Sequence, residues 1–103
     1  ALVLPHVLRF NAKVAPKPYA ELAPFVFPDL MPLEGQARAE AFCDALAELS
    51  RRCGLQQRLS ELDIPREILP KLASDAMNQT RLLVNNPREV SEADALAIYQ
   101  AAW

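Results

Sequence analysis

Few side chains in this sequence could carry out chemistry. There is one histidine, His6, and there are two cysteines, Cys43 and Cys53. A structural zinc site takes four ligands, and a serine or cysteine nucleophile needs a base beside it. An isolated histidine on an apolar helix is more typical of a packing residue than of a catalytic base, because catalysis needs an oriented partner. The residue types therefore predict neither a closed metal site nor nucleophilic catalysis.

The two cysteines lie ten positions apart on one predicted helix. A rise of 1.5 Å per residue separates them by about 15 Å, whereas a disulfide needs Cα atoms within about 7 Å. We expect both to be free thiols in a reducing compartment.

No signal peptide and no apolar run of about twenty residues is visible, so we expect a cytoplasmic protein that does not enter a membrane.

Three carboxylates, Glu40, Asp44 and Glu48, lie on one face of the same helix, with Arg51 and Arg52 one turn further on. Such a cluster could hold a metal ion. A solvated face with i, i+3 and i, i+4 ion pairs is the simpler interpretation, because the cations follow within one helical turn. We expect a surface here rather than a metal centre.

Composition excludes several classes of protein. The 103 residues are 51% hydrophobic and 23% charged, with a net charge of −2. A chain with this balance has no cationic surface for nucleic acid or anionic lipid, and its size allows one small domain. Its two glycines form neither a phosphate-binding loop nor a dinucleotide fingerprint.

Helical periodicity without strand alternation predicts an all-α domain, a compact bundle of about five helices. We expect helices over 2–10, from Pro16 to Pro24 or a little beyond it, over 35–53, from Ile64 to Ala76 or Met77, and from Ser91 to the end. Pro24 either ends or kinks the second helix, and Pro70 allows the fourth to be a tight turn followed by a helix starting near Pro70. Between residues 55 and 62 we expect a connection with one helical turn.

Two segments are predicted as loops. Phe27–Leu33 should be rigid because of its prolines, with Phe27, Leu30, Met31 and Leu33 tucked under neighbouring helices. Thr80–Arg88 lacks helical periodicity and contains Asn85-Asn86-Pro87, which opposes a helix. Because loops on a rigid scaffold carry many binding residues, Thr80–Arg88 is where we expect a site.

Two helices carry clear packing and boundary signals. In the helix over 35–53, Phe42, Ala45, Leu46, Leu49 and Cys53 form one apolar stripe, and Gly54 suits its left-handed end. The last helix opens with Ser91 and Asp94 at the spacing of a capping box. Its aromatic residues, Tyr99 and Trp103, are better explained by core packing than by a ligand cage.

Several segments, in their order and spacing, resemble the end of iron-containing alcohol dehydrogenases. They are residues 4–11 (LPHVLRFN), 19–23 (YAELA), 54–56 (GLQ), 58–62 (RLSEL), 64–65 (IP), 86–88 (NPR) and 101–103 (AAW). The resemblance covers the whole chain and about the last quarter of such an enzyme. Residues 1–103 would thus be a C-terminal helical subdomain, part of the dehydroquinate-synthase-like helical domain of a longer two-domain enzyme. An apolar run that begins at Ala1 without a capping residue agrees with this expectation.

The resemblance implies an oxidoreductase that interconverts alcohols with aldehydes or ketones. Its N-terminal α/β domain binds NAD or NADP, and its helical domain holds a divalent metal, commonly iron, through one Asp and three His. The last metal-binding His opens a His-Gly-x-x-Asn segment that precedes the residues matching Ala1 onward, so we expect no metal and no nucleotide to bind this chain alone. We therefore expect the isolated chain to be inactive.

The resemblance also indicates a substrate side for this chain. In relatives the loop before Asn86-Pro87-Arg88 approaches the substrate pocket, often with Cys or another small residue where this sequence has Leu82. We therefore interpret Leu82 and Leu83 as substrate-binding residues of a more apolar pocket. The alternative, that both leucines fill the helical core, stays open at this point.

The expected partners are the rest of the same polypeptide, namely its nucleotide-binding domain and metal-ligand helices, and a small alcohol or aldehyde. We also expect the enzyme to be a homo-oligomer. The isolated chain should self-associate, because Leu2, Val3, Val7 and Leu8 at its start would lose the helices that cover them in the intact enzyme. A second hypothesis is a free-standing helical protein-interaction module on the same scaffold. The reading frame upstream of Ala1 separates the two, because only the enzyme needs a nucleotide domain and a His-Gly-x-x-Asn segment there.

Overall fold

The computed structural model describes all of residues 1–103, and every regular element in it is helical. The α-helices are α1 (Leu4–Ala12), α2 (Pro16–Val26), α3 (Gly35–Arg52), α4 (Leu69–Ala76), α5 (Thr80–Asn85) and α6 (Glu92–Ala102). Short 3-10 helices cover Pro28–Leu30, Leu59–Leu62 and Arg66–Ile68. The all-α prediction is confirmed, with six α-helices in place of about five.

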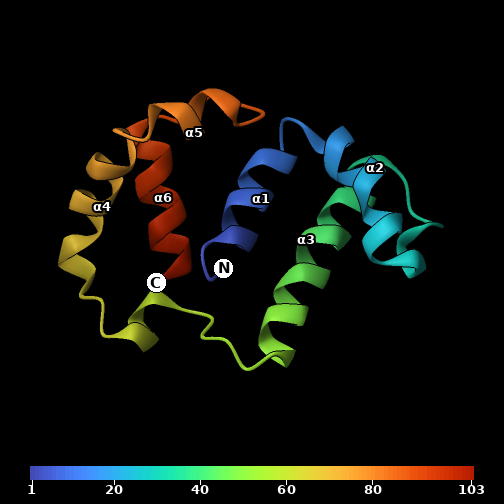
Figure 1. The fold of residues 1–103 in the computed structure, drawn as a ribbon, viewed down its shortest axis with the longest axis horizontal. Helices are drawn as coiled ribbons and strands as arrows, with labels where there is room; N and C mark the ends of the chain where they lie inside the picture. The colour runs from blue at the N-terminus through green and yellow to red at the C-terminus, as the bar shows by residue number, and fades with distance from the viewer.

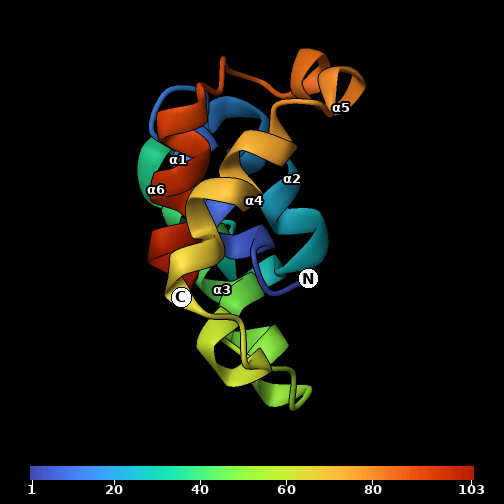
Figure 2. The ribbon, with the colours of Figure 1, turned by 90° about the vertical axis from the view of Figure 1, so that its left-hand side faces the viewer.

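Helix α1 lies at the centre of the fold (Figure 1). On one side it packs against α3, which also packs along α2, and on the other side it contacts α6, which packs along α4. The molecule measures 42 × 31 × 19 Å, so it is a thin slab, as the turned view confirms (Figure 2). Its radius of gyration of 14.4 Å exceeds the roughly 13 Å expected for a compact domain of this length.

Each side of α1 has its own small core. Ala12, Ala20, Ala39 and Cys43 are buried where α1, α2 and α3 meet. On the other side, Leu59, Leu69 and Ala102 are buried with Trp103 packed against them. Small side chains dominate the first core, so the three helices approach one another closely.

Helix α2 continues past Pro24, which therefore does not end it. A proline has no N–H to donate to the carbonyl four residues earlier, here that of Ala20. The guanidinium of Arg38 on α3 donates to this carbonyl at 3.3 Å. The helix thus continues to Val26 because a neighbouring helix supplies the missing donor.

The 27–33 segment is less buried than predicted. Phe27 does pack, with its ring edge-on to Phe42 of α3 at 6.0 Å between centroids. Met31 is 61% exposed and Leu33 is 39% exposed, so the expectation that they tuck under neighbouring helices was wrong. Both residues follow the 3-10 turn at Pro28–Leu30 and lie in the connection between α2 and α3.

The apolar stripe of α3 is buried only along its first half. Ala39, Phe42 and Cys43 are buried, whereas Leu49 and Cys53 are exposed. Helix α3 has 18 residues and α1 only nine, so the last turns of α3 extend past the helices that cover its beginning. Gly54 has φ = +76°, which confirms the left-handed helix end.

The predicted loop over 80–88 was wrong for its first six residues, which form α5. The amides of Leu82 and Leu83 both donate to the carbonyl of Gln79 at 3.0 Å and begin the helix. Pro87 restricts only the residue directly before it, Asn86, which is extended with ψ = 142°. The proline therefore ends α5 and does not prevent it.

Two other boundary predictions are confirmed. A 3-10 turn over Arg66–Ile68 leads into α4 at Leu69, which is the alternative of a tight turn before a helix near Pro70. At the start of α6 the Ser91 hydroxyl accepts from the Asp94 amide at 3.1 Å, and the Asp94 carboxylate accepts from the Ser91 amide at 3.0 Å. The capping box is complete.

Candidate functional site: an apolar hollow beside α5

An apolar hollow of about 160 Å³ lies between the start of α1, the end of α4, α5 and α6. Nine of its ten lining residues are hydrophobic, and the tenth is Asn86. The hydrophobic lining includes Val3, Val7, Leu82, Leu83, Ile98 and Tyr99. The hollow thus brings both predicted substrate-binding leucines together with residues far away in the sequence.

The exposure of the two leucines bears on the alternative that they fill the core. Leu82 is 61% exposed and Leu83 is half-buried. No residue of α5 is buried. In this chain both leucines therefore line an open hollow rather than a closed core.

His6 does not line this hollow. It lies half-buried on α1, in a groove against α6 that also holds Arg9 and Lys13. Burial lowers the pKa of His6 below its ordinary value of 6.5, and the charge of Arg9 adds to the effect. The imidazole is therefore neutral at physiological pH, in keeping with a packing role.

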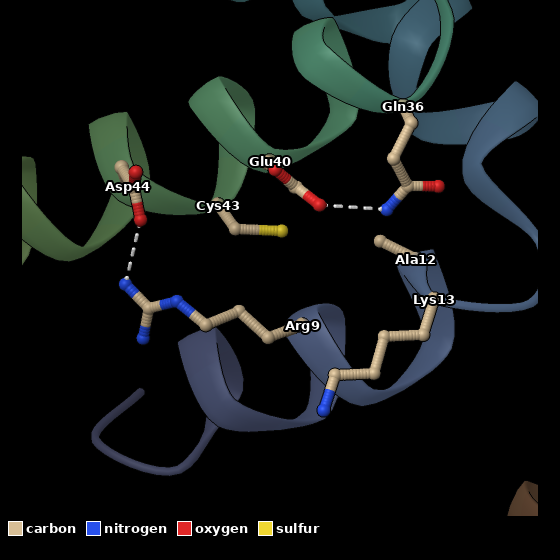
Figure 3. Close-up of a pocket in the computed structure, with 7 residues that line it drawn as sticks. All are labelled: Arg9, Ala12, Lys13, Gln36, Glu40, Cys43 and Asp44. Atoms are coloured by element: carbon tan, nitrogen blue, oxygen red, sulfur yellow. Dashed lines mark hydrogen bonds and ion pairs between the residues drawn. The ribbon is translucent and has the colours of Figure 1, made fainter.

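A second, polar hollow of about 250 Å³ lies between α1 and α3 (Figure 3). Arg9 reaches across it to Asp44, with Nη2 3.0 Å from Oδ1, and Gln36 donates to Glu40 at 3.0 Å. Cys43 points into the gap between the two helices, where burial raises the pKa of its thiol. Of the four charged residues that line this hollow, Arg9 and Asp44 form an ion pair, whereas Lys13 and Glu40 do not pair with each other.

The predicted ion pairs along the carboxylate face of α3 are confirmed only in part, because Glu40 accepts a hydrogen bond from the neutral Gln36 and has no ion pair. Glu48 pairs with Arg51 at 2.6 Å, and hydrogen bonds from Arg51 hold the pKa of Glu48 below its usual range. Asp44 takes its partner from α1 rather than from its own helix. No group of three His, Cys, Asp or Glu residues is placed to hold a metal ion.

Both cysteines are free thiols, as predicted. Cys43 is buried between α1 and α3, whereas Cys53 is exposed beyond the end of α3. No helix of the chain is both long enough and apolar enough to cross a membrane.

Sequence reasoning missed one polar contact beside the hollow. Asn11 is 2% exposed, and its amide nitrogen donates to the side-chain oxygen of Asn86 at 2.8 Å. Asn86 returns a bond of 2.8 Å to the oxygen of Asn11. The available signal was a lone asparagine in the apolar 2–12 stretch, since a buried amide needs partners.

Comparison with known proteins agrees with the resemblance found in the sequence. Lactaldehyde reductase of Escherichia coli (strain K12) is 28% identical over all 103 residues, which cover 27% of its own length. 1,3-Propanediol dehydrogenase of Citrobacter freundii is 30% identical over all 103 residues, which cover 26% of that protein. The chain thus spans about a quarter of the length of these relatives.

A solved structure supports the same relationship. A crystal structure of 1,3-propanediol oxidoreductase matches 99% of this chain with a TM-score of 0.90 and 28% identity, over 26% of that longer chain. The family model for the Fe-containing alcohol dehydrogenase family, C-terminal, matches residues 1–103. Both the sequence and the fold of this chain match those of the family over essentially its whole length. The chain therefore belongs to the Fe-containing alcohol dehydrogenase family.

Proposed function

We propose that this chain is the C-terminal helical part of a metal- and NAD(P)-dependent alcohol dehydrogenase that interconverts a small alcohol with its aldehyde or ketone. The family match over the whole chain supports this proposal. The relatives are named for lactaldehyde and 1,3-propanediol, which are both small and oxygen-bearing. The chain's contribution is the wall of the alcohol pocket and packing against the rest of the enzyme.

The observation that carries the pocket proposal is the hollow beside α5. Leu82 and Leu83 line it with Val3, Val7 and Tyr99, so its wall can contact the carbon chain of an alcohol but offers little to its hydroxyl. An apolar wall of this kind selects substrates by length and branching, because each methylene that fits or clashes changes the free energy of the transition state. We assign Leu82 and Leu83 to substrate binding on this ground.

The residues of this chain do not fit a metal site or a nucleotide site. His6 has no second histidine, cysteine or carboxylate arranged around a common centre, and no loop is rich in glycine. We therefore place the metal, commonly iron in this family, and the NAD or NADP on other parts of the polypeptide, and derive no reaction step from residues of this chain. Those parts are its proposed partners.

The exposed apolar surface supports contact with those partners and with a second copy of the enzyme. Leu2, Val3, Val7 and Leu8, from which self-association was expected, are half-buried against the cores and the hollow, so they are less exposed than that expectation assumed. Leu4, Phe25 and Val26 are at least 46% exposed. We propose that this surface is covered in a cytoplasmic homo-oligomer.

The experiment is an assay of the full-length protein that carries these residues. The protein is loaded with Fe²⁺, and reduction of NAD⁺ or NADP⁺ is followed with small primary alcohols and diols. We expect nucleotide reduction that depends on alcohol and is abolished by a chelator. A reading frame that starts within a few residues of Ala1 and lacks a nucleotide domain would refute the proposal and favour a free-standing interaction module.

A further inference from the structure

Side-chain hydrogen bonds join the end of α1 to the residue that follows α5. Asn11 and Asn86, 75 positions apart, exchange two hydrogen bonds of 2.8 Å. We propose that this amide pair, together with Arg88, is the tether that holds α5 against α1 and so sets the position of the Leu82 and Leu83 wall. The expected effect on alcohol binding rests on the proposed function, whereas the tether itself does not.

The four amide hydrogens of the pair all have acceptors. Asn11 donates its second hydrogen to the Tyr19 hydroxyl at 3.1 Å, and Asn86 donates its second to the Arg88 carbonyl at 2.8 Å. No buried side-chain nitrogen or oxygen in the chain lacks a partner. Asn11 is buried and Asn86 is half-buried, so removing the Asn86 side chain leaves the buried Asn11 amide without this partner, which costs more than the bond itself contributes.

Arg88 adds a second link between the same two segments. Its Nη1 donates to the Phe10 carbonyl at 2.9 Å, and its guanidinium lies 3.7 Å from the centre of the Phe10 ring. Phe10 is in the last turn of α1, where carbonyls lack helical donors and a cation is favourable. The segment 86–88 therefore contacts both the backbone of the last turn of α1, at the Phe10 carbonyl, and its side chains, at Phe10 and Asn11.

Helix α5 has little else to hold it. It has six residues, none of them buried, and Asn86 is the residue that directly follows its last turn. A helix this short is not stable by itself. Its position relative to α1 and α6, and with it the shape of the hollow, therefore depends on the anchored residue at its end.

The test uses Asn86→Ala in the full-length enzyme, with Asn85→Ala as the matched control. Asn85 is adjacent and exposed, and it bonds only to the Arg81 carbonyl within α5. Hydrogen exchange of the α5 amides reports the tether directly. We expect exchange at Leu82 and Leu83 to rise about tenfold or more in Asn86→Ala, from the loss of a buried partner, and to change little in the control.

Kinetics separate positioning from general loss of structure. In Asn86→Ala we expect the KM for alcohol to rise several-fold while the KM for the nicotinamide nucleotide stays unchanged. Arg88→Gln, which keeps the amide pair, should give a smaller change of the same kind and is the variant to use if Asn86→Ala does not fold. Unchanged exchange in α5 in the folded variant would overturn the tether, as would equal increases in KM for alcohol and nucleotide. The proposed pocket is tested separately, by the substrate preference of Leu82→Ala, in which Asn11, Asn86 and Arg88 are all present. A negative result there would count against the pocket and not against the tether.

Discussion

Leu82 is the residue at which the proposed alcohol pocket can be tested most sharply. It is 61% exposed and lines the hollow beside α5. Fully burying a leucine side chain contributes about 1.5–3 kcal/mol, so the two fifths of Leu82 that is covered accounts for roughly 1 kcal/mol. We therefore expect Leu82→Ala to lower the free energy of unfolding by about 1 kcal/mol or less, well below the roughly 2–5 kcal/mol typical of a core leucine.

The effect on substrate preference should be larger than the effect on stability. Shortening Leu82 enlarges the hollow by about three carbon atoms, and one methylene in an apolar pocket is worth about 1–3 kcal/mol of transition-state binding. In the full-length enzyme the ratio of kcat/KM for a longer alcohol to that for a shorter one should therefore rise about tenfold or more. The measurement is a series of straight-chain alcohols beside a denaturant unfolding curve.

Val84→Ala is the matched control for this variant. Val84 lies on the same short helix and is 82% exposed, but it does not line the hollow. It should change neither the chain-length preference nor the stability by a measurable amount. If Leu82→Ala leaves the chain-length preference unchanged and lowers the free energy of unfolding by several kcal/mol, the pocket assignment is refuted. Leu82 would then be a core residue.

Four further predictions concern the cap of α6, the titration of His6, self-association of the chain and its lack of metal and nucleotide binding. Ser91→Ala should cost about 0.5–2 kcal/mol of stability, measured by denaturant unfolding, because it removes the cap of α6. Because the pKa of His6 is lowered on folding, the unfolded chain takes up the proton first, so stability should decline as the pH falls below about 6.5 and His6→Gln should flatten this decline. The 103-residue chain by itself should sediment as a dimer or larger species, since Phe25 is 87% exposed, and a clean monomer at high concentration would contradict this. Calorimetric titration of the same chain with Fe²⁺, Zn²⁺ or NAD⁺ should show no binding at micromolar concentration, because no three ligand residues converge.

Local signals in the sequence were sufficient for much of the fold. Ser91 and Asp94 predicted the start of the last helix, and Gly54 predicted the end of α3, because caps depend on a few neighbouring residues. The family resemblance rests on short segments in a fixed order. It directed attention to Leu82 and Leu83, but their place beside α1 and α6 required the fold.

Some predictions stayed open or failed, for different reasons. Pro24 could be interpreted either way until Arg38 of a neighbouring helix was seen to bond the carbonyl that the proline leaves free. The 80–85 segment was assigned to a loop because a proline follows it, although a proline constrains only the residue directly before it. The exposed last turns of α3 could not be foreseen from periodicity, which finds an apolar face but not how far a neighbour covers it.

The sequence by itself determined the helical class, the cap of α6, the left-handed end of α3 and the free thiols, since each depends on composition or on spacing within one helix. Only the tertiary structure decided which distant residues meet. Asn11 and Asn86 are unremarkable polar residues in the sequence, yet the fold buries the first and gives it the second as its partner. A hydrogen bond across 75 positions has no local signal, because it forms only where α1 and the end of α5 are brought together.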